Sequence, residues 1–255
     1  MLMARRFYQH IVPLLLVCLA VPLLLGAEFW AKKPYQHWSP EETQRMLEES
    51  PWATTLSLGG VENVLTGSNA STAQVNPAPR GQSGTPGDRG EMETNPTISY
   101  NLQFRSAEPI REAQVRSSQL SSHYDAMSAE QKAAFDANAA KFLEAKFPDR
   151  VVVSVTFKTN VQGYESSLRT YWESQNRATL NPSVFLDAGK ERLSLMDYSF
   201  KVDTFVFTFP RPKQVAPDQK IAVEFIHPKI SRVGQQRVLQ EFSLKKMLVN
   251  GEPAF

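Results

Sequence analysis

Histidines and carboxylates could take part in catalysis or metal binding, and they are scattered along this sequence. His37, His123 and His227 lie far apart, and none has a metal-ligand spacing to another histidine or to a carboxylate. In His123-Tyr124-Asp125 an imidazole lies near an acid, but between two expected helices, where polar side chains are usually solvated. The sequence therefore predicts no local zinc motif and no catalytic role for His123, and we expect both His123 and His227 to be solvated.

Asp197, Asp203 and Glu224 lie near the ends of expected strands, where a pair of carboxylates could serve a glycosidase. The rim of a β domain carries such residues in any case, so we interpret the three as rim residues without a catalytic role and expect Asp203 to be solvated. A Gly-x-Ser-x-Gly elbow is absent, since Gly81-Gln82-Ser83-Gly84 matches it only in part, and no phosphate-binding glycine loop follows a strand. We therefore assign no catalytic, cofactor-binding or metal-binding residue, and expect no cofactor.

Three of the four tryptophans, Trp30, Trp38 and Trp52, are concentrated in one short segment. Between them a helix is expected to begin with a capping box, in which Ser39 is the cap and Glu42 completes the box. One interpretation is a helix that packs on the main domain, and the other is a docking peptide for an envelope partner, because exposed tryptophans often anchor interfaces. We name the three tryptophans as possible interaction residues.

Residues 1–27 have the layout of a signal peptide: Arg5 and Arg6, an apolar stretch, and small residues at Gly26 and Ala27. Cleavage would release the protein into the periplasm, envelope or medium; the alternatives are an uncleaved single-pass anchor or lipidation at Cys18. Because Cys18 is the only cysteine, the mature chain would form no disulfide and carry no thiol nucleophile or cysteine zinc site.

Composition divides the remaining chain into three parts. Residues 28–65 form the tryptophan-rich helical segment, residues 66–96 are rich in Gly, Pro, Ser, Thr and Asn and predict a flexible, disordered linker, and residues 97–255 form the folded domain.

The net charge is +2, from 28 basic and 26 acidic residues, with no basic block interleaved with aromatics. We therefore expect no nucleic-acid partner.

The folded domain is predicted to be α+β. Apolar residues alternate at 98–104 and 151–157, which indicates strands, and a helical hairpin at about 107–147 is inserted between them. The second helix of this hairpin is expected to begin with a capping box of Ser128 and Gln131 and to carry an apolar stripe of Phe135, Ala139 and Phe142. Further strand-like runs follow, so we expect an antiparallel, immunoglobulin-like β-sandwich. Tyr164, Tyr171 and Trp172 could form a carbohydrate platform, but their helical spacing favours core packing. The predicted core includes Phe205 and Phe209 and, as the set chosen for substitution, Leu102, Phe104, Val153, Val155, Phe207, Phe225 and Leu244.

Several segments carry a resemblance to a known group. They are Trp38-Ser39-Pro40-Glu41-Glu42, Ser50-Pro51-Trp52-Ala53 and residues 100–106, 127–132 and 246–251. Together they resemble uncharacterised exported proteins of soil bacteria of the acidobacterial type. The resemblance implies a location in the bacterial envelope, and it brings no activity, cofactor or site residue with it.

The sequence favours a non-enzymatic envelope or secreted protein with a binding or structural role. The alternatives are an exported hydrolase whose site assembles from distant residues and a membrane-anchored accessory subunit. The expected partner is an envelope protein or polymer, and contact with the membrane is expected only through an uncleaved N-terminal segment.

Overall fold

The computed structural model describes residues 29–59 and 95–255. The predicted signal peptide, and the predicted linker except for its last two residues, lie outside this part of the chain. Within the described residues, no helix is both long enough and apolar enough to cross a membrane.

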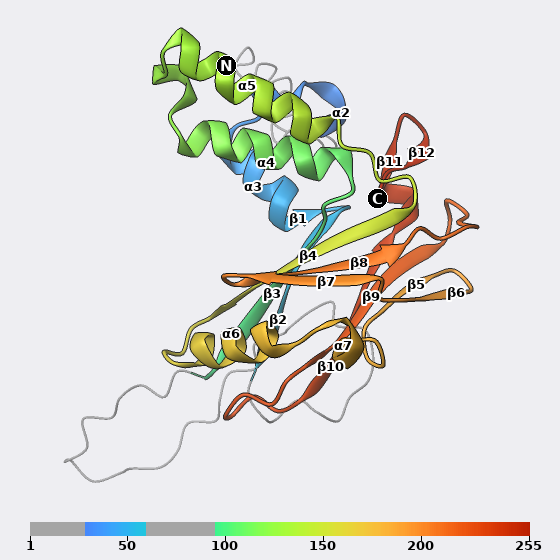
Figure 1. Ribbon diagram of the computed structural model, residues 1–255. Helices are drawn as coiled ribbons and strands as arrows, with labels where there is room; N and C mark the ends of the chain where they lie inside the picture. The colour runs from blue at the N-terminus through green and yellow to red at the C-terminus, as the bar shows by residue number, and fades with distance from the viewer. Residues whose placement is uncertain (1–28, 60–94) are drawn as a thin grey trace, which may run out of the picture.

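Two antiparallel sheets and a set of helices make up an α+β fold (Figure 1). The larger sheet has the order β1 (Glu49–Ser50), β2 (Ala53–Gly59), β3 (Thr97–Phe104), β4 (Arg150–Thr159), β8 (Thr204–Pro210) and β7 (Asp197–Lys201). The smaller sheet has the order β10 (Gln236–Ser243), β9 (Lys220–His227), β5 (Phe185–Ala188) and β6 (Glu191–Ser194). A short hairpin of β11 (Leu248–Val249) and β12 (Glu252–Pro253) follows near the C-terminus.

Alternation along the strands separates an apolar face from a polar one. In β3 the buried residues Tyr100 and Leu102 alternate with Asn101 and Gln103, which lie on the outer face. The register then places Leu102 opposite Val155 of β4. Because successive side chains of a strand point to opposite faces, the whole buried set of each strand lies on the same side of the sheet.

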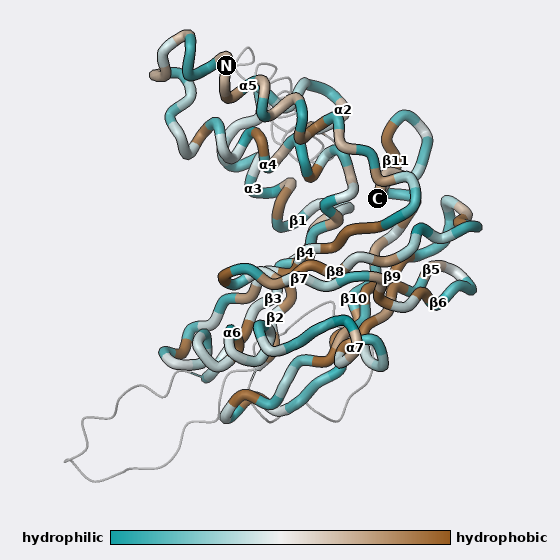
Figure 2. The backbone as a smooth tube through the Cα atoms, viewed as in Figure 1, coloured by the Kyte–Doolittle hydropathy of each residue, from teal (hydrophilic) through white to brown (hydrophobic). Residues whose placement is uncertain are grey.

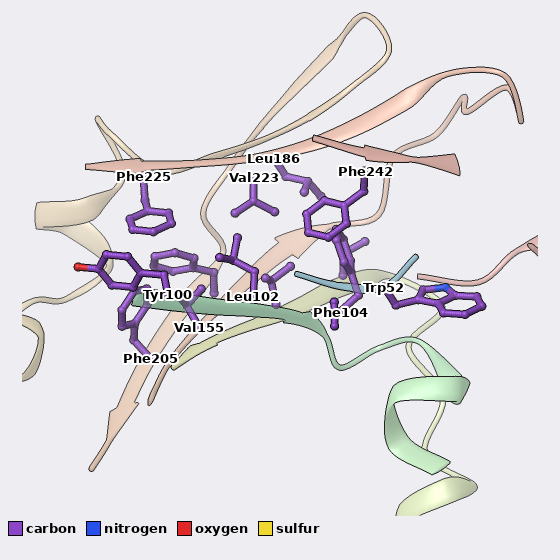
Figure 3. Packing of buried hydrophobic residues seen from close by; sticks show 14 of the residues in the cluster. Trp52, Tyr100, Leu102, Phe104, Val155, Leu186, Phe205, Val223, Phe225 and Phe242 are labelled. Carbon is purple, nitrogen blue, oxygen red and sulfur yellow. The ribbon is translucent and has the colours of Figure 1, made fainter. Parts of the chain in front are cut away.

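The inner faces of the two sheets contact each other through aromatic side chains. Figure 3 shows Phe225 and Phe242 of the smaller sheet pointing toward Tyr100 and Phe104 of the larger one. The ring centroids of Tyr100 and Phe225 lie 5.3 Å apart, and those of Phe104 and Phe242 lie 4.9 Å apart, both in edge-to-face geometry. The predicted core is confirmed, since the following residues are fully buried: Leu102, Phe104, Val153, Val155, Phe205, Phe207, Phe209, Phe225 and Leu244.

A helical hairpin, α4 (Glu108–Ser121) and α5 (Ala129–Leu143), connects β3 to β4 at the predicted place. Both predicted capping boxes form, at the starts of α3 (Pro40–Glu48) and α5. Figure 1 places α3, α4 and α5 together beyond one end of the larger sheet. Hydrophobic stretches run along β4 and β8, whereas the hydropathy of α5 changes from turn to turn (Figure 2).

The remaining helices are α2 (Phe29–Lys32), α6 (Tyr164–Ser174) and α7 (Arg177–Leu180), with 3₁₀ turns η2 (Tyr35–His37), η4 (Tyr124–Ala126) and η5 (Leu244–Lys246). Trp172 of α6 is fully buried and stacks on Phe205 with a centroid distance of 3.9 Å. Tyr164 and Tyr171 are half-buried beside the core. For Trp172, core packing is therefore the observed use.

The tryptophan-rich segment belongs to the same body as the rest of the fold, which corrects the predicted division of the chain. Strand β2 pairs with β3 along its whole length, from Ala53 opposite Gln103 to Gly59 opposite Thr97. In addition, the Trp52 indole donates a hydrogen bond to the carbonyl oxygen of Ala254. Residues 97–255 are thus not self-contained, because their sheet and core are completed by residues that precede the predicted linker.

Candidate functional site

The tryptophans predicted as possible interaction residues are used mainly for packing. Trp38 and Trp52 are fully buried, and Trp30 is half-buried. Phe29 contacts Trp38 edge to face at 5.4 Å, and Trp30 contacts Trp52 in the same way at 5.8 Å. Fully buried rings are not available as surface anchors, so Trp30 alone of the three retains exposed area.

The prediction that His227 is solvated is wrong. Its side chain is fully buried at the end of β9, on the inner face that also carries Phe225. Nδ1 is hydrogen-bonded to the Tyr100 hydroxyl at 2.7 Å, and Nε2 makes no hydrogen bond with any described residue. Burial lowers the pKa of His227 to about 4, because the charged imidazolium would lose its hydration.

The other two histidines are exposed and distant from this pair. His37 ends η2, and His123 follows α4 with a positive φ of 52°. The prediction of a solvated His123 is confirmed. Within residues 29–59 and 95–255, no group of three His, Cys, Asp or Glu side chains is placed to hold a metal ion.

The three carboxylates do not come together. Glu224 lies within β9, on the outer face of the smaller sheet, and is almost completely buried, which corrects its predicted place on the rim. Arg237 donates two hydrogen bonds to it, at 2.8 and 2.6 Å, and Arg192 donates one at 3.1 Å. These guanidinium hydrogen bonds hold the pKa of Glu224 below its usual value despite burial.

Asp197 begins β7 of the larger sheet, and Asp203 lies in the turn between β7 and β8. Asp203 is partly exposed and accepts a hydrogen bond from Arg169 at 2.6 Å. Asp197 is exposed. Because Glu224 lies on the other sheet and these two are separated by the length of β7, the structure brings together no pair of the predicted carboxylates.

A groove lies where the apolar side of α5 faces α3 and α4. None of the 15 residues of α5 is buried. Phe135 and Phe142 of α5, Val115 of α4 and Leu47 of α3 line an open groove with a volume of about 680 Å³. The sequence predicts the apolar stripe of α5, and in the folded chain part of that stripe is left uncovered.

A chain of side-chain amides fixes the walls of this groove. Gln114 of α4 donates to the side-chain oxygen of Gln103 at 3.2 Å, and Gln103 donates to the carbonyl oxygen of Leu47 at 2.9 Å. Asn101 donates to the same carbonyl at 3.0 Å. These bonds satisfy a carbonyl in the last turn of α3 and connect that helix to β3 and α4.

Arg105 is the charged residue of the groove. It follows β3 directly, is half-buried, and among the described residues makes no hydrogen bond and no ion pair. Burial alone lowers its pKa from the usual value, and the guanidinium stays protonated. The neighbouring Arg111 and Arg116 differ, since they donate to the carbonyl oxygens of Ser106 and Trp38 at 2.6 and 2.9 Å.

Sequence reasoning missed Arg105. One signal was present, because the strand period places Arg105 on the same outer face as Asn101 and Gln103. Nothing local to the sequence shows that α5 folds back over this position, or that no carboxylate accompanies it.

No protein-family model matches the chain, and no curated protein matches it. A solved structure with some likeness is a crystal structure described as a novel protein of unknown function from Burkholderia pseudomallei K96243. It is 9% identical in sequence, with a TM-score of 0.36, and the alignment covers 55% of this chain and 73% of that one.

Proposed function

We propose that the protein is an exported, non-enzymatic binding protein of the bacterial envelope or medium, and that its ligand occupies the groove between α3, α4 and α5. The observation that carries the proposal is the uncovered apolar side of α5. The groove volume of about 680 Å³ is within the range of roughly 300–1,000 Å³ that is common for small-molecule sites.

The apolar walls supply the driving force for binding. Phe135 and Phe142 are only half-buried in the free protein, so a ligand with an apolar body would remove further apolar surface from water. Full burial of a side chain of this size contributes about 1.5–3 kcal/mol. Among the polar groups that line the groove, Gln114 and Ser118 are held in place by hydrogen bonds and would orient the ligand.

The rest of the fold supports the groove as a rigid base. As part of this proposal we interpret the two packed sheets as an immunoglobulin-like β-sandwich that carries the helical hairpin between β3 and β4. In this view Trp38 and Trp52 position α3 as a wall of the groove. In this proposal Trp38 and Trp52 support the groove from inside the fold and do not themselves contact an envelope partner.

Export is the second part of the proposal, and it is supported by the sequence of residues 1–27. A chain cleaved after Ala27 would begin one residue before the described part of the structure, so the groove would be intact in the mature protein.

Binding is tested with the neutral apolar dye N-phenyl-1-naphthylamine, whose fluorescence rises in an apolar site. We compare Asn138→Trp, which places a large ring at the groove, with Ala137→Trp, an exposed neighbour on α5 that does not line it. The wild type should bind the dye, Asn138→Trp should bind at least about tenfold more weakly, and Ala137→Trp should bind normally. The proposal fails if the wild type binds no dye or if both variants bind equally well.

A further inference from the structure

The unpaired charge of Arg105 identifies the kind of ligand that the groove would take. We infer that the ligand is a monocarboxylate with an apolar tail, whose carboxylate pairs with the Arg105 guanidinium while the tail lies against Phe135 and Phe142. This inference rests on the proposed function, and it adds the chemical class of the ligand.

The first step of the argument is the isolation of the charge. Arg105 is the charged residue among those that line the groove, and among the described residues no acid pairs with it. Buried or half-buried charges in proteins are normally paired, because removing a charge from water is costly. A ligand that brings one negative charge would supply the missing partner.

The second step concerns the number of charges. A guanidinium matches a carboxylate in a two-bond arrangement, and one arginine balances one carboxylate. A phosphate monoester carries nearly two negative charges, and the groove offers no second cation or helix N-terminus pointed at Arg105 among its lining residues. One charge among the apolar side chains that line the groove therefore fits a simple amphiphilic acid best.

The third step concerns selectivity. A neutral amphiphile that covers the groove would bury Arg105 further and leave it without a partner, whereas a carboxylate would form charge-assisted hydrogen bonds with it. The groove should therefore prefer the acid to the alcohol of the same chain length by at least about tenfold.

The experiment measures displacement of N-phenyl-1-naphthylamine by decanoate and by 1-decanol, using protein purified from the periplasm of a bacterial host with its processed N-terminus. The variants are Arg105→Gln, Arg105→Lys and, as a control of equal net charge, the exposed Lys141→Gln. We expect decanoate to bind the wild type and Lys141→Gln at least about tenfold more tightly than Arg105→Gln, with 1-decanol unaffected by any of the three. Arg105→Lys should retain part of the preference for the acid.

The outcomes separate the two proposals. If the dye binds but decanoate and 1-decanol compete equally in the wild type and in Arg105→Gln, the inference is overturned while the groove remains a binding site. If the dye does not bind at all, both fail. Should Arg105→Gln fold poorly, the ratio of decanoate to 1-decanol affinity in the wild type and in Arg105→Lys decides, since a ratio near one contradicts the role of the charge.

Discussion

Acid should weaken the fold through His227. This imidazole is fully buried, is hydrogen-bonded to the Tyr100 hydroxyl, and has a pKa lowered by burial from 6.5 to about 4. Between these two values the folded protein keeps His227 neutral, whereas the unfolded chain takes up a proton. Because the unfolded state binds more protons, the free energy of unfolding falls as the pH is lowered from about 6.5 to about 4, and the contribution of His227 is complete above that interval.

The magnitude follows from the difference between the two pKa values. A difference of about 2.5 pH units, at 1.36 kcal/mol per unit, corresponds to about 3 kcal/mol. Most of it, about 2.5 kcal/mol, should be lost by about pH 4.5, where carboxylates also titrate, so the share of His227 is isolated by comparison with a variant that lacks the imidazole. For a protein of ordinary stability this is a large share of the total.

The assay is urea unfolding followed by tryptophan fluorescence at about pH 7.5, 6, 5 and 4.5. His227→Phe keeps an aromatic ring in the site but removes the titrating group. Between about pH 7.5 and 4.5, the free energy of unfolding of this variant should therefore fall by about 2–3 kcal/mol less than that of the wild type. The control is His123→Asn, at an exposed position whose positive φ asparagine tolerates. It should keep the wild-type pH dependence.

His227→Phe leaves the Tyr100 hydroxyl without its partner, so the variant is expected to be less stable at neutral pH. Only the change with pH is therefore compared, and Tyr100→Phe serves as a second variant that keeps the buried imidazole. Equal pH dependence in the wild type and in His227→Phe would refute the reasoning.

Four further predictions concern packing, charge, cleavage and export. Trp52→Ala should lower the free energy of unfolding by about 3–5 kcal/mol, as truncation of a buried aromatic does, and urea unfolding that shows no loss would contradict its burial. Glu224→Gln should reduce the loss of stability below about pH 4.5, because the lowered pKa of this carboxyl makes its stabilising contribution vanish as the pH falls. If the variant loses as much unfolding free energy below about pH 4.5 as the wild type, the ion pairs of Glu224 with Arg192 and Arg237 do not stabilise the fold. Proteolysis within residues 66–96 should yield two fragments that elute together in gel filtration, since β2 pairs with β3; separation without denaturant would show that this pairing is weak. Mass spectrometry of the protein from an exporting host should find a start near Glu28, and an intact Met1 in the membrane fraction would favour the anchor.

Local rules made several elements predictable from the sequence. The capping boxes at Ser39 and Ser128 depend on residues only three positions apart, and both form in the structure. The alternation in β3 and the three phenylalanines of β8 depend only on the period of an extended chain, so their buried faces are predicted correctly.

His227 and Glu224 show where local reasoning is insufficient. The alternation that buries Phe225 also places His227 on the inner face, but a histidine at a strand end is equally common in solvent, and only the sheet opposite it decides its burial. Glu224 is covered by arginines from β6 and β10, whose positions depend on strand pairing. Neither environment can be derived from neighbours in the sequence.

The same distinction applies to the candidate groove and to the tryptophan-rich segment. The sequence by itself determined the apolar stripe of α5, the helix start at Ser39 and the outward position of Arg105, because each follows from the backbone period or from residues a few positions away. Only the tertiary structure decided that β2 completes the larger sheet, that Trp38 and Trp52 are buried, and that Arg105 lies in a groove without an acid beside it. Which face of an element is apolar depends on local order, whereas whether that face is covered depends on contacts between segments far apart in the chain.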